Sequence, residues 1–584
     1  MRSGSGRKQL APDFGMSWVS RLLHAGAVLW LAQAGVAYGQ AAPPPSGQIL
    51  QGIERSLPNR QPGNQQAPVI EVQKAPAASA NTAARVTVKA YRISGNTVFA
   101  EKTLLRLVES HTGELSLNDL YAVADILTRY YRTRGFLVAR AYLPQQEIKD
   151  GIITLAILED HYDQIGTHSS ARVSDDRVLR TIGSAVCSDG TECKGALIVA
   201  DKLERGLLIL NDTPGVHASA RLSPGGETGT SNLDVNATAE PLLSGMVTLD
   251  NEGDYYTGNA RAIANVWLNS PLGYGDQLSL QTVESVIHGS LAYGAVGYSV
   301  PFGYDGLRLS ARGWNLGYHL GGTYSPLGEQ GTAYGGDITL SYPFIRSQSA
   351  NLYGSLDYGD RRFHDSSTAI GLSDRRGISN RVETALNGDL QDDFLGAPAF
   401  TNYTLSYAHG TLGLDATLAA TDVLTARTAG GYDKEIVTLT RLQSVFDRSA
   451  LYVKVTGQNA SKNLDAYEKF SLGGPDAVRA YPTEDGLVDE AVLYSVEWRQ
   501  RFDNIVPRTL EAVLFYDHGT GHINTRPWQA GPNSVTLDGV GGGLNIPLSG
   551  RVLLKSFIAF RGDRPFTAAP DHPVQYGLQL STVF

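Results

Sequence analysis

The chain has 584 residues, of which 42% are hydrophobic and 18% are charged, and 64 residues, or 11%, are glycine. This hydrophobic content excludes a disordered chain, and the length predicts more than one domain. The net charge of −9, from 49 basic and 58 acidic residues, argues against nucleic acid as a partner. Beyond the N-terminus there is no run of 18 apolar residues, so a membrane role would require a β-barrel.

The first 40 residues have the pattern of a secretory signal peptide. Arg21 and His24 precede an apolar stretch at 25–37, and small residues follow at Ala37 and Gly39. The alternative, a buried helix of a cytosolic protein, is disfavoured because an Ala/Pro/Gln-rich tract follows immediately. The sequence therefore predicts cleavage near residue 40 and export from the cytoplasm.

The only two cysteines, Cys187 and Cys193, flank a turn-forming stretch of five residues. In an oxidising compartment such a pair is expected to form a disulfide. The alternative, half of a metal site, would need further Cys or His ligands nearby, and the sequence has none there. No metal site is predicted.

Residues 46–57 place apolar side chains at helical spacing, which predicts one amphipathic helix of about three turns. Pro58 ends that pattern. The segment 58–85 is rich in proline, glutamine and alanine without periodicity, so it is predicted to be a flexible linker.

Residues 86–159 indicate a compact α+β domain in the order strand, helix, helix, strand, strand. The first strand is expected around Val86 and Val88, and Gly135 is expected to close the second helix. The same order recurs over 160–240, so the sequence predicts two copies of one small α+β unit.

From residue 241 to 584 the pattern changes to glycine- and tyrosine-rich segments with alternating polarity. Over 492–502, apolar or aromatic side chains alternate with Ser495, Glu497 and two arginines. We count about sixteen such segments, and (584 − 240)/16 gives 21.5 residues for each strand with its loop. These features are typical of an outer-membrane β-barrel, although a soluble sandwich can also alternate.

The sorting of the loops favours the barrel over the sandwich. Connections on one side are short and turn-like, at 270–273, 301–303 and 547–550. Connections on the other side are long, at 319–331, 363–378, 459–487 and 520–536. Short turns on one rim and long loops on the other are expected of an outer-membrane barrel.

Two segments within the barrel region carry recognisable motifs. Residues 470–482, Phe-Ser-Leu-Gly-Gly-Pro-Asp-Ala-Val-Arg-Ala-Tyr-Pro, lie in the longest loop, and residues 514–519, Leu-Phe-Tyr-Asp-His-Gly, lie on the thirteenth segment. With two preceding α+β repeats, these motifs resemble the outer-membrane transporters of two-partner secretion, of the haemolysin activator/secretion type. That family has two POTRA domains before a 16-stranded antiparallel barrel.

The resemblance covers the whole mature chain and implies roles for particular residues. It implies that the helix at 46–57 plugs the barrel and that the terminal aromatic Phe584 is an assembly signal. It also implies that the loop folds into the lumen, where Arg479 meets Asp517 on the barrel wall. The loop motif comprises Gly473, Gly474, Val478, Arg479, Ala480 and Tyr481, with alanine at 480 where the family usually has glycine.

An inward-facing Asp517 is also expected from the residues alone. It shares parity with Glu511 and Val513, opposite an apolar row that includes Leu514 and Tyr516. Enzyme motifs are absent: there is no Gly-x-Ser-x-Gly, no His-Glu-x-x-His and no phosphate loop. The glycines at 539–543 lack the flanking context of a dinucleotide site and are expected to allow close packing at the wall. Neither a catalytic site nor a cofactor is predicted.

The expected function is transport of one large exoprotein, of adhesin or haemolysin type, from the periplasm to the surface of a Gram-negative cell. The exposed edges of the two POTRA sheets would capture it by strand addition. Further expected partners are outer-membrane lipid and, during biogenesis, the barrel-assembly machinery and periplasmic chaperones. The alternatives are a barrel-assembly factor of the same superfamily, a passive porin and an outer-membrane hydrolase.

Overall fold

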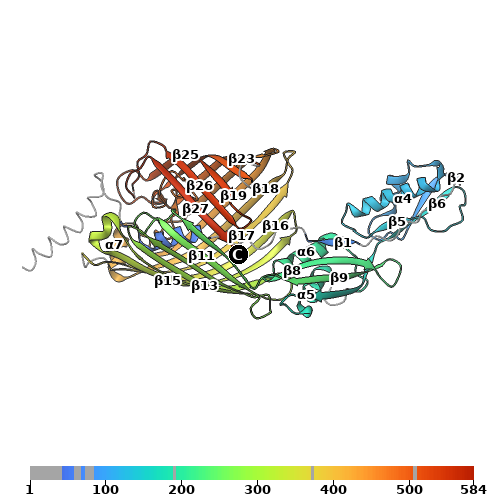
Figure 1. The fold of residues 1–584 in the computed structure, drawn as a ribbon, viewed down its shortest axis with the longest axis horizontal. Helices are drawn as coiled ribbons and strands as arrows, with labels where there is room; N and C mark the ends of the chain where they lie inside the picture. The colour runs from blue at the N-terminus through green and yellow to red at the C-terminus, as the bar shows by residue number, and fades with distance from the viewer. Residues whose placement is uncertain are drawn as a thin grey trace, which may run out of the picture.

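The computed structural model describes residues 43–57, 68–72, 85–187, 193–369, 374–503, 509–567 and 569–584. Within them the chain forms an N-terminal helix, two α+β domains and a closed barrel (Figure 1). The predicted signal peptide and most of the predicted linker lie outside the described residues. No helix among the described residues is long and apolar enough to cross a membrane.

Helix α2 (Ser46–Ser56) ends one residue before the predicted boundary. Ile49, Leu50 and Ile53 recur at helical spacing, and all three side chains are buried. The helix lies inside the barrel (Figure 1), where this apolar face joins a core formed by wall residues such as Leu316. Burial against the wall stabilises a helix that would be too short to persist alone in water.

The first α+β domain comprises β2 (Arg85–Val88), β3 (Ala90–Ser94), α3 (Glu101–Val108), β4 (Gly113–Ser116), α4 (Leu117–Arg132), β5 (Arg140–Tyr142) and β6 (Ile152–Leu158). In its main sheet β6 is central, parallel to β3 and antiparallel to β5, while β2 pairs with β4.

Three details of the first domain differ from the prediction, the first being that strand β4 lies between the two helices, where none was expected. The expected single first strand is divided into β2 and β3, because the backbone turns at Lys89 to donate to the Gly151 carbonyl at 2.8 Å. Helix α4 ends at Arg132, three residues before Gly135, which instead lies in the following turn with φ of +90°. Such a φ suits glycine, which has no Cβ to clash.

Glu159 follows β6 and is 5% exposed. Its carboxylate accepts hydrogen bonds from the backbone N–H of Thr97 at 2.8 Å and of Val98 at 3.0 Å, and from the Tyr131 hydroxyl. Burial raises the pKa of Glu159, but these hydrogen bonds outweigh it and hold the pKa below its ordinary value of 4.5. The ionised carboxylate therefore ties the loop after β3 to α4.

The second α+β domain repeats the first. It comprises β7 (His161–Ser169), α5 (Asp175–Val186), α6 (Ala200–Asn211), β8 (Val216–Pro224) and β9 (Thr230–Ala239). Strand β9 is parallel to β7 and antiparallel to β8, as β6 is to β3 and β5. The predicted repetition is confirmed, but a fourth strand, β1 (Ile70–Val72), pairs with β8. In the second domain β1 therefore covers three residues of the β8 edge, and capture by strand addition at the sheet edges stays a prediction.

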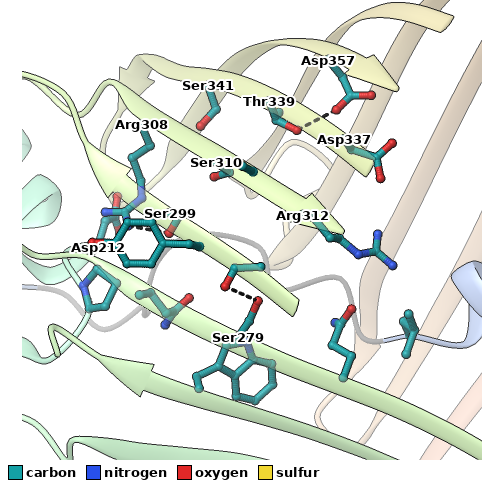
Figure 2. A pocket seen from close by; sticks show the side chains of 18 of the residues that line it. Asp212, Ser279, Ser299, Arg308, Ser310, Arg312, Asp337, Thr339, Ser341 and Asp357 are labelled. Carbon is teal, nitrogen blue, oxygen red and sulfur yellow. Dashed lines mark hydrogen bonds between the residues drawn. The ribbon is translucent and has the colours of Figure 1, made fainter. Parts of the chain in front are cut away.

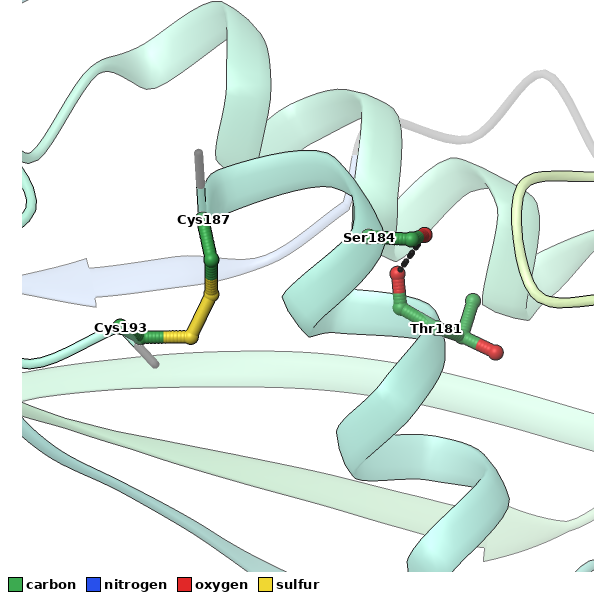
Figure 3. The surroundings of a disulfide bond; sticks show 4 residues. All are labelled: Thr181, Ser184, Cys187 and Cys193. Carbon is green, nitrogen blue, oxygen red and sulfur yellow. Dashed lines mark hydrogen bonds between the residues drawn. A yellow bond between two sulfur atoms is a disulfide. The ribbon is translucent and has the colours of Figure 1, made fainter. Parts of the chain in front are cut away.

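Cys187 and Cys193 form a disulfide in the second domain (Figure 3), with their Cα atoms 4.8 Å apart. Cys187 caps the C-terminus of α5, where its N–H donates to the Gly183 carbonyl at 2.9 Å. The bond joins the end of this helix to the residue that leads toward α6. A crosslink of this kind limits the freedom of the unfolded chain.

The barrel has sixteen antiparallel strands, so the predicted fold class is confirmed. The strands are β10 (Leu243–Asp250), β11 (Ala260–Asn269), β12 (Gln277–Val286), β13 (Ser290–Pro301), β14 (Arg308–His319), β15 (Glu329–Arg346), β16 (Ala350–Ser367), β17 (Asp374–Asp392), β18 (Ala399–Leu414), β19 (Gly430–Phe446), β20 (Ser449–Ala460), β23 (Glu490–Phe502), β24 (Leu510–His522), β25 (Ser534–Pro547), β26 (Val552–Arg561) and β27 (Val574–Val583). Pairing of β10 with β27 closes the barrel.

Side chains alternate across the wall as predicted. On β23 the side chains of Val492 and Trp498 are exposed on the outer face, whereas Ser495 and Glu497 are buried on the inner face. At the C-terminus Tyr576 is 70% exposed on the same outer surface. An apolar outer face and a polar inner face are what a lipid bilayer and an aqueous lumen require.

The loops are sorted between the two rims as expected, with two corrections. The loop predicted at 363–378 is shorter, because β16 continues to Ser367 and β17 begins at Asp374. A long connection containing α7 (Ala416–Leu424) was not among those predicted. The loop after β14 contains a 3-10 helix, η2 (Gly322–Leu327). These strands extend beyond the apolar band, and there both faces carry polar side chains. The alternation of polarity that predicts a strand is therefore missing at the strand ends.

Candidate functional site

Residues 461–489, here called the lumenal loop, connect β20 to β23 and fold into the barrel. Two short strands within it, β21 (Phe470–Ser471) and β22 (Leu487–Val488), pair with each other. The loop packs into one core with the wall, in which the loop's Leu472, Val478 and Tyr481 are at most 2% exposed. The wall contributes apolar inward side chains, including Leu493 and Leu537. The loop is thus a packed part of the barrel interior.

Arg479 makes several of the polar contacts between the lumenal loop and the wall. Its guanidinium donates twice to the Asp517 carboxylate, from Nε at 2.8 Å and from Nη2 at 2.7 Å, and once to Glu497 from Nη1 at 2.7 Å. Asp517 is fully buried, and the Ser495 hydroxyl also donates to it at 2.6 Å. The guanidinium carbon lies 3.5 Å from the centre of the Phe515 ring. One arginine therefore meets two carboxylates and one aromatic face.

The structure gives a reason why alanine is accommodated at position 480. Ala480 is fully buried, and its φ is not positive, so its backbone does not require glycine. Across the contact, a Cβ added to Gly539 would come within 2.7 Å of the Cβ of Ala480. The missing side chain at 539 makes room for the one at 480. Close packing was expected of these strand glycines, and this contact is one case of it.

The other loop residues named from the sequence fix the shape of the turn. Gly474 has φ of +114°, and a Cβ on Gly473 would meet the Pro482 carbonyl oxygen at 2.1 Å. The Tyr481 hydroxyl donates to the Arg564 carbonyl at 3.1 Å. Phe584 lies at the barrel closure, where its N–H and carbonyl both pair with Gly245 at 3.0 Å.

Helix α2 is held by the lumenal loop as well as by the wall. The Gln51 amide donates to the Tyr467 carbonyl at 3.0 Å, and Arg55 donates to the Ser471 carbonyl at 3.3 Å. The Tyr467 hydroxyl donates to Glu54 at 2.9 Å. A Cβ added to Gly47 would come within 2.8 Å of the Tyr467 Cβ. Helix and loop therefore occupy the lumen as one interlocked unit.

A buried charge cluster beside this unit was not predicted. Lys434 on β19 forms an ion pair with Glu468 of the lumenal loop, and Arg381 on β17 lies 3.7 Å from the same carboxylate. Lys434 and Glu468 are at most 6% exposed. The sequence did hold one indication of it: the alternation along β19 places the Lys434 side chain on the inner face of the wall. Such groups stay charged inside a protein only when they are paired.

A polar cavity of about 1030 Å³ opens below α2. Glu54 and Leu57 line one end, and Asp212 and Pro214 of the second domain line the other. Figure 2 shows the wall between them, covered by hydroxyl-bearing and charged side chains of β12 to β16, such as Ser310. This polar surface lines a space between the second domain and α2.

The second domain is docked on the rim that carries the short turns. Arg346 at the end of β15 forms a two-pronged ion pair with Asp212, with both N–O distances 2.7 Å. Arg177 on α5 donates to the Gly303 carbonyl at 3.3 Å, and the Ser184 hydroxyl donates to the Tyr304 carbonyl at 3.0 Å. These contacts place one α+β domain directly at the mouth of the cavity.

The described residues contain no group of three or more His, Cys, Asp or Glu side chains arranged to hold a metal ion. Ion pairs and hydrogen bonds nevertheless link loop, wall and helix, as between Glu468 and Lys434 and between Tyr467 and Glu54.

Comparison with known proteins identifies the family. The profile described as haemolysin secretion/activation protein ShlB/FhaC/HecB matches residues 229–546, and that described as POTRA domain, ShlB-type, matches residues 86–160. The heme/hemopexin transporter protein HuxB of Haemophilus influenzae (strain 86-028NP) is 28% identical over 489 residues, which cover 82% of this chain and 84% of HuxB.

Two solved structures have a similar fold. CdiB from Escherichia coli aligns over 99% of this chain and 100% of its own, with a TM-score of 0.65 and 20% identity. BamA from Haemophilus ducreyi lacking POTRA domains 1–3 aligns over 85% of this chain and 100% of its own, with a TM-score of 0.51 and 14% identity. The family profile covers more than half of the chain, and a sixteen-stranded barrel follows two POTRA-type domains. The chain therefore belongs to the haemolysin secretion/activation family of outer-membrane transporters, which serve two-partner secretion.

Proposed function

We propose that this chain binds one large exoprotein in the periplasm and carries it, unfolded, through the barrel to the cell surface. The observation that carries the proposal is an α+β domain docked at the mouth of a polar cavity whose other end is lined by Glu54 of α2. An export channel needs a periplasmic receptor, a wet path and a barrier at rest. The chain supplies each from a different segment.

The receptor step rests on the first domain. Strand β5 is an outer strand of its sheet, with Arg140 and Tyr142 exposed. An extended segment of the exoprotein would add to this edge, with backbone hydrogen bonds giving affinity and alternate side chains giving selectivity. The path is the cavity beneath α2, and the helix with the lumenal loop forms the barrier. No phosphate loop is present in the sequence to couple ATP hydrolysis to transport.

For biogenesis we propose the partners common to outer-membrane barrels, namely periplasmic chaperones and the barrel-assembly machinery. Phe584 would present the recognition signal, since it ends the closing strand pair. We assign no enzymatic activity and no cofactor to the chain. A passive porin would not need two docked periplasmic domains, and a hydrolase would need a nucleophile paired with a base.

A barrel-assembly factor is the second candidate, because the BamA fold is similar. The feature that separates the two functions is α2, which lies inside the barrel here (Figure 1).

The test is co-expression of the chain with the large exported protein encoded next to its gene. The expected result is that this protein accumulates in the medium only when the transporter is present. A chain lacking residues 86–240 serves as the control, and its insertion into the membrane is monitored by heat-modifiable migration. If insertion of unrelated barrels fails without the chain while export is unchanged, the assembly function is the correct one.

A further inference from the structure

The edge of the second domain's sheet is occupied by a strand from outside the domain. Strand β1 pairs in parallel with β8, with Ile70 opposite Ala220 and Val72 opposite Leu222. The Ala220 N–H donates to the Val69 carbonyl at 2.9 Å. The half-buried Ile70 side chain packs against the core of the second domain. Without β1, β8 would be the outer strand of this sheet.

The same edge has a second internal partner. The Asn211 side chain, at the end of α6, accepts from the Ala218 N–H at 2.6 Å and donates to the Ala218 carbonyl at 3.3 Å. Together, Asn211 and β1 satisfy the outward backbone N–H groups of Ala218 and Ala220. Unsatisfied groups of this kind are what an incoming strand binds, so the edge is closed in this state.

The first domain differs at the corresponding position. Among the described residues no strand pairs with the free side of β5. There, the Thr128 side chain accepts from the Ala141 N–H at 3.0 Å, but nothing corresponds to β1. The two repeats therefore present one open edge and one closed edge.

We propose that β1 is an internal competitor for strand capture, which holds the β8 edge closed until α2 leaves the barrel. This inference deepens the proposed function and rests on it. Thirteen residues, 57–69, connect the end of α2 to the start of β1. Because this connection is short, withdrawal of the helix from the barrel would pull on β1 and release it from β8. An exported segment held first on the open β5 edge would then take the place of β1.

The pairing is suited to replacement. Strand β1 pairs with three of the nine residues of β8, whereas β9 pairs with all nine. Glu71 and Val72 are exposed, which leaves Ile70 as the main apolar contact. A covalently attached strand competes through its high effective concentration even when its own contacts are few. A longer extended segment that occupies more of β8 can displace it.

The first test measures binding of a strand in trans to the full-length purified chain. The probe is a fluorescent peptide with the sequence of residues 67–75. We compare the wild type with a variant in which β1 is removed by V69G, I70S, E71G and V72S. The variant is expected to bind the peptide at least about tenfold more tightly, because the wild-type edge is free only in the fraction of molecules from which β1 has left. Equal affinity for both chains would overturn the proposal.

The second test locks β1 in place with a disulfide between E71C and R221C, which are registered partners on the two strands. The matched control is S219C with N236C, registered partners on β8 and β9, which leaves β1 free. Both variants are studied oxidised and after reduction. The oxidised lock is expected to lose peptide binding and to export no more of the adjacent-gene exoprotein than the 86–240 deletion, and reduction should restore both. The control should match the wild type throughout.

The outcomes separate the two hypotheses. If the oxidised lock still exports normally, or binds the peptide as the β1-free variant does, β1 is not a competitor and the inference fails. If the wild type exports nothing while the peptide results hold, the proposed function fails, but the closed edge stands.

Discussion

Arg479→Ala is expected to release the lumenal loop from the wall while the barrel stays folded. The substitution removes two hydrogen bonds to Asp517 and one to Glu497, and it leaves both buried carboxylates without this partner. Removing one member of a buried ion pair costs about 3–5 kcal/mol. At about 1.4 kcal/mol for each factor of ten, the ratio of docked to undocked loop falls roughly a hundred- to a few thousand-fold.

Asp517→Ala should be milder than Arg479→Ala. The guanidinium keeps its contact with Glu497 at 2.7 Å and its position over Phe515. In the double variant, the second substitution should add little, because the direct contact can be lost only once. Arg376→Ala is the matched control, since Arg376 is an exposed arginine at the same rim whose side chain pairs with Asp374 and contacts neither the lumenal loop nor these carboxylates.

The assay is hydrogen exchange of the backbone amides at 472–486, read by mass spectrometry, together with the yield of exported partner. These amides include the Leu472 N–H, which donates to the Gly486 carbonyl at 3.0 Å only when the turn is formed. Exchange should accelerate in Arg479→Ala, with export reduced and barrel abundance unchanged. Wild-type protection in Arg479→Ala, or losses that simply add in the double variant, would refute the coupling.

Three further predictions concern other parts of the molecule. Deletion of residues 46–57 should raise ion conductance in planar bilayers while export persists, because α2 obstructs the lumen; unchanged conductance would reject this role. Deletion of residues 86–240 should leave a barrel that inserts but exports nothing, and continued export would reject the capture role. Glu159→Gln should destabilise the first domain at neutral pH, as measured by hydrogen exchange of its amides. Since the folded pKa of Glu159 lies below 4.5, the carboxylate stabilises the domain above that pH, so the difference between variant and wild type should shrink as the pH falls through the folded pKa. A difference that is constant with pH would contradict this assignment.

Much of the architecture was predictable because it depends on side-chain periodicity. Alternation over 492–502 marks a strand whose two faces meet different solvents, and the helical spacing of Ile49, Leu50 and Ile53 marks a buried face. The inward parity of Asp517 likewise followed from its neighbours. Each of these features acts through side-chain polarity, which a single sequence displays directly.

The remaining features depend on backbone contacts or on distant pairings. Strand β1 is three residues long, too short for periodicity to be recognised, and its pairing with β8 joins segments about 150 residues apart in the sequence. The ion pair of Lys434 with Glu468 joins a strand to a loop that returns into the lumen. Polarity along the chain carries no information about either partner.

The way in which α2 is held has an evolutionary consequence. Gln51 and Arg55 bind main-chain carbonyl oxygens of the lumenal loop, and every residue type carries such an oxygen. Side-chain contacts are made by Tyr467, which bonds Glu54, and by Phe470, whose ring centre lies 4.8 Å from the Arg55 guanidinium carbon; substitutions elsewhere in the loop leave the carbonyl acceptors in place. Substitutions in this part of the loop can therefore change its side chains while α2 keeps its hydrogen bonds to the main chain.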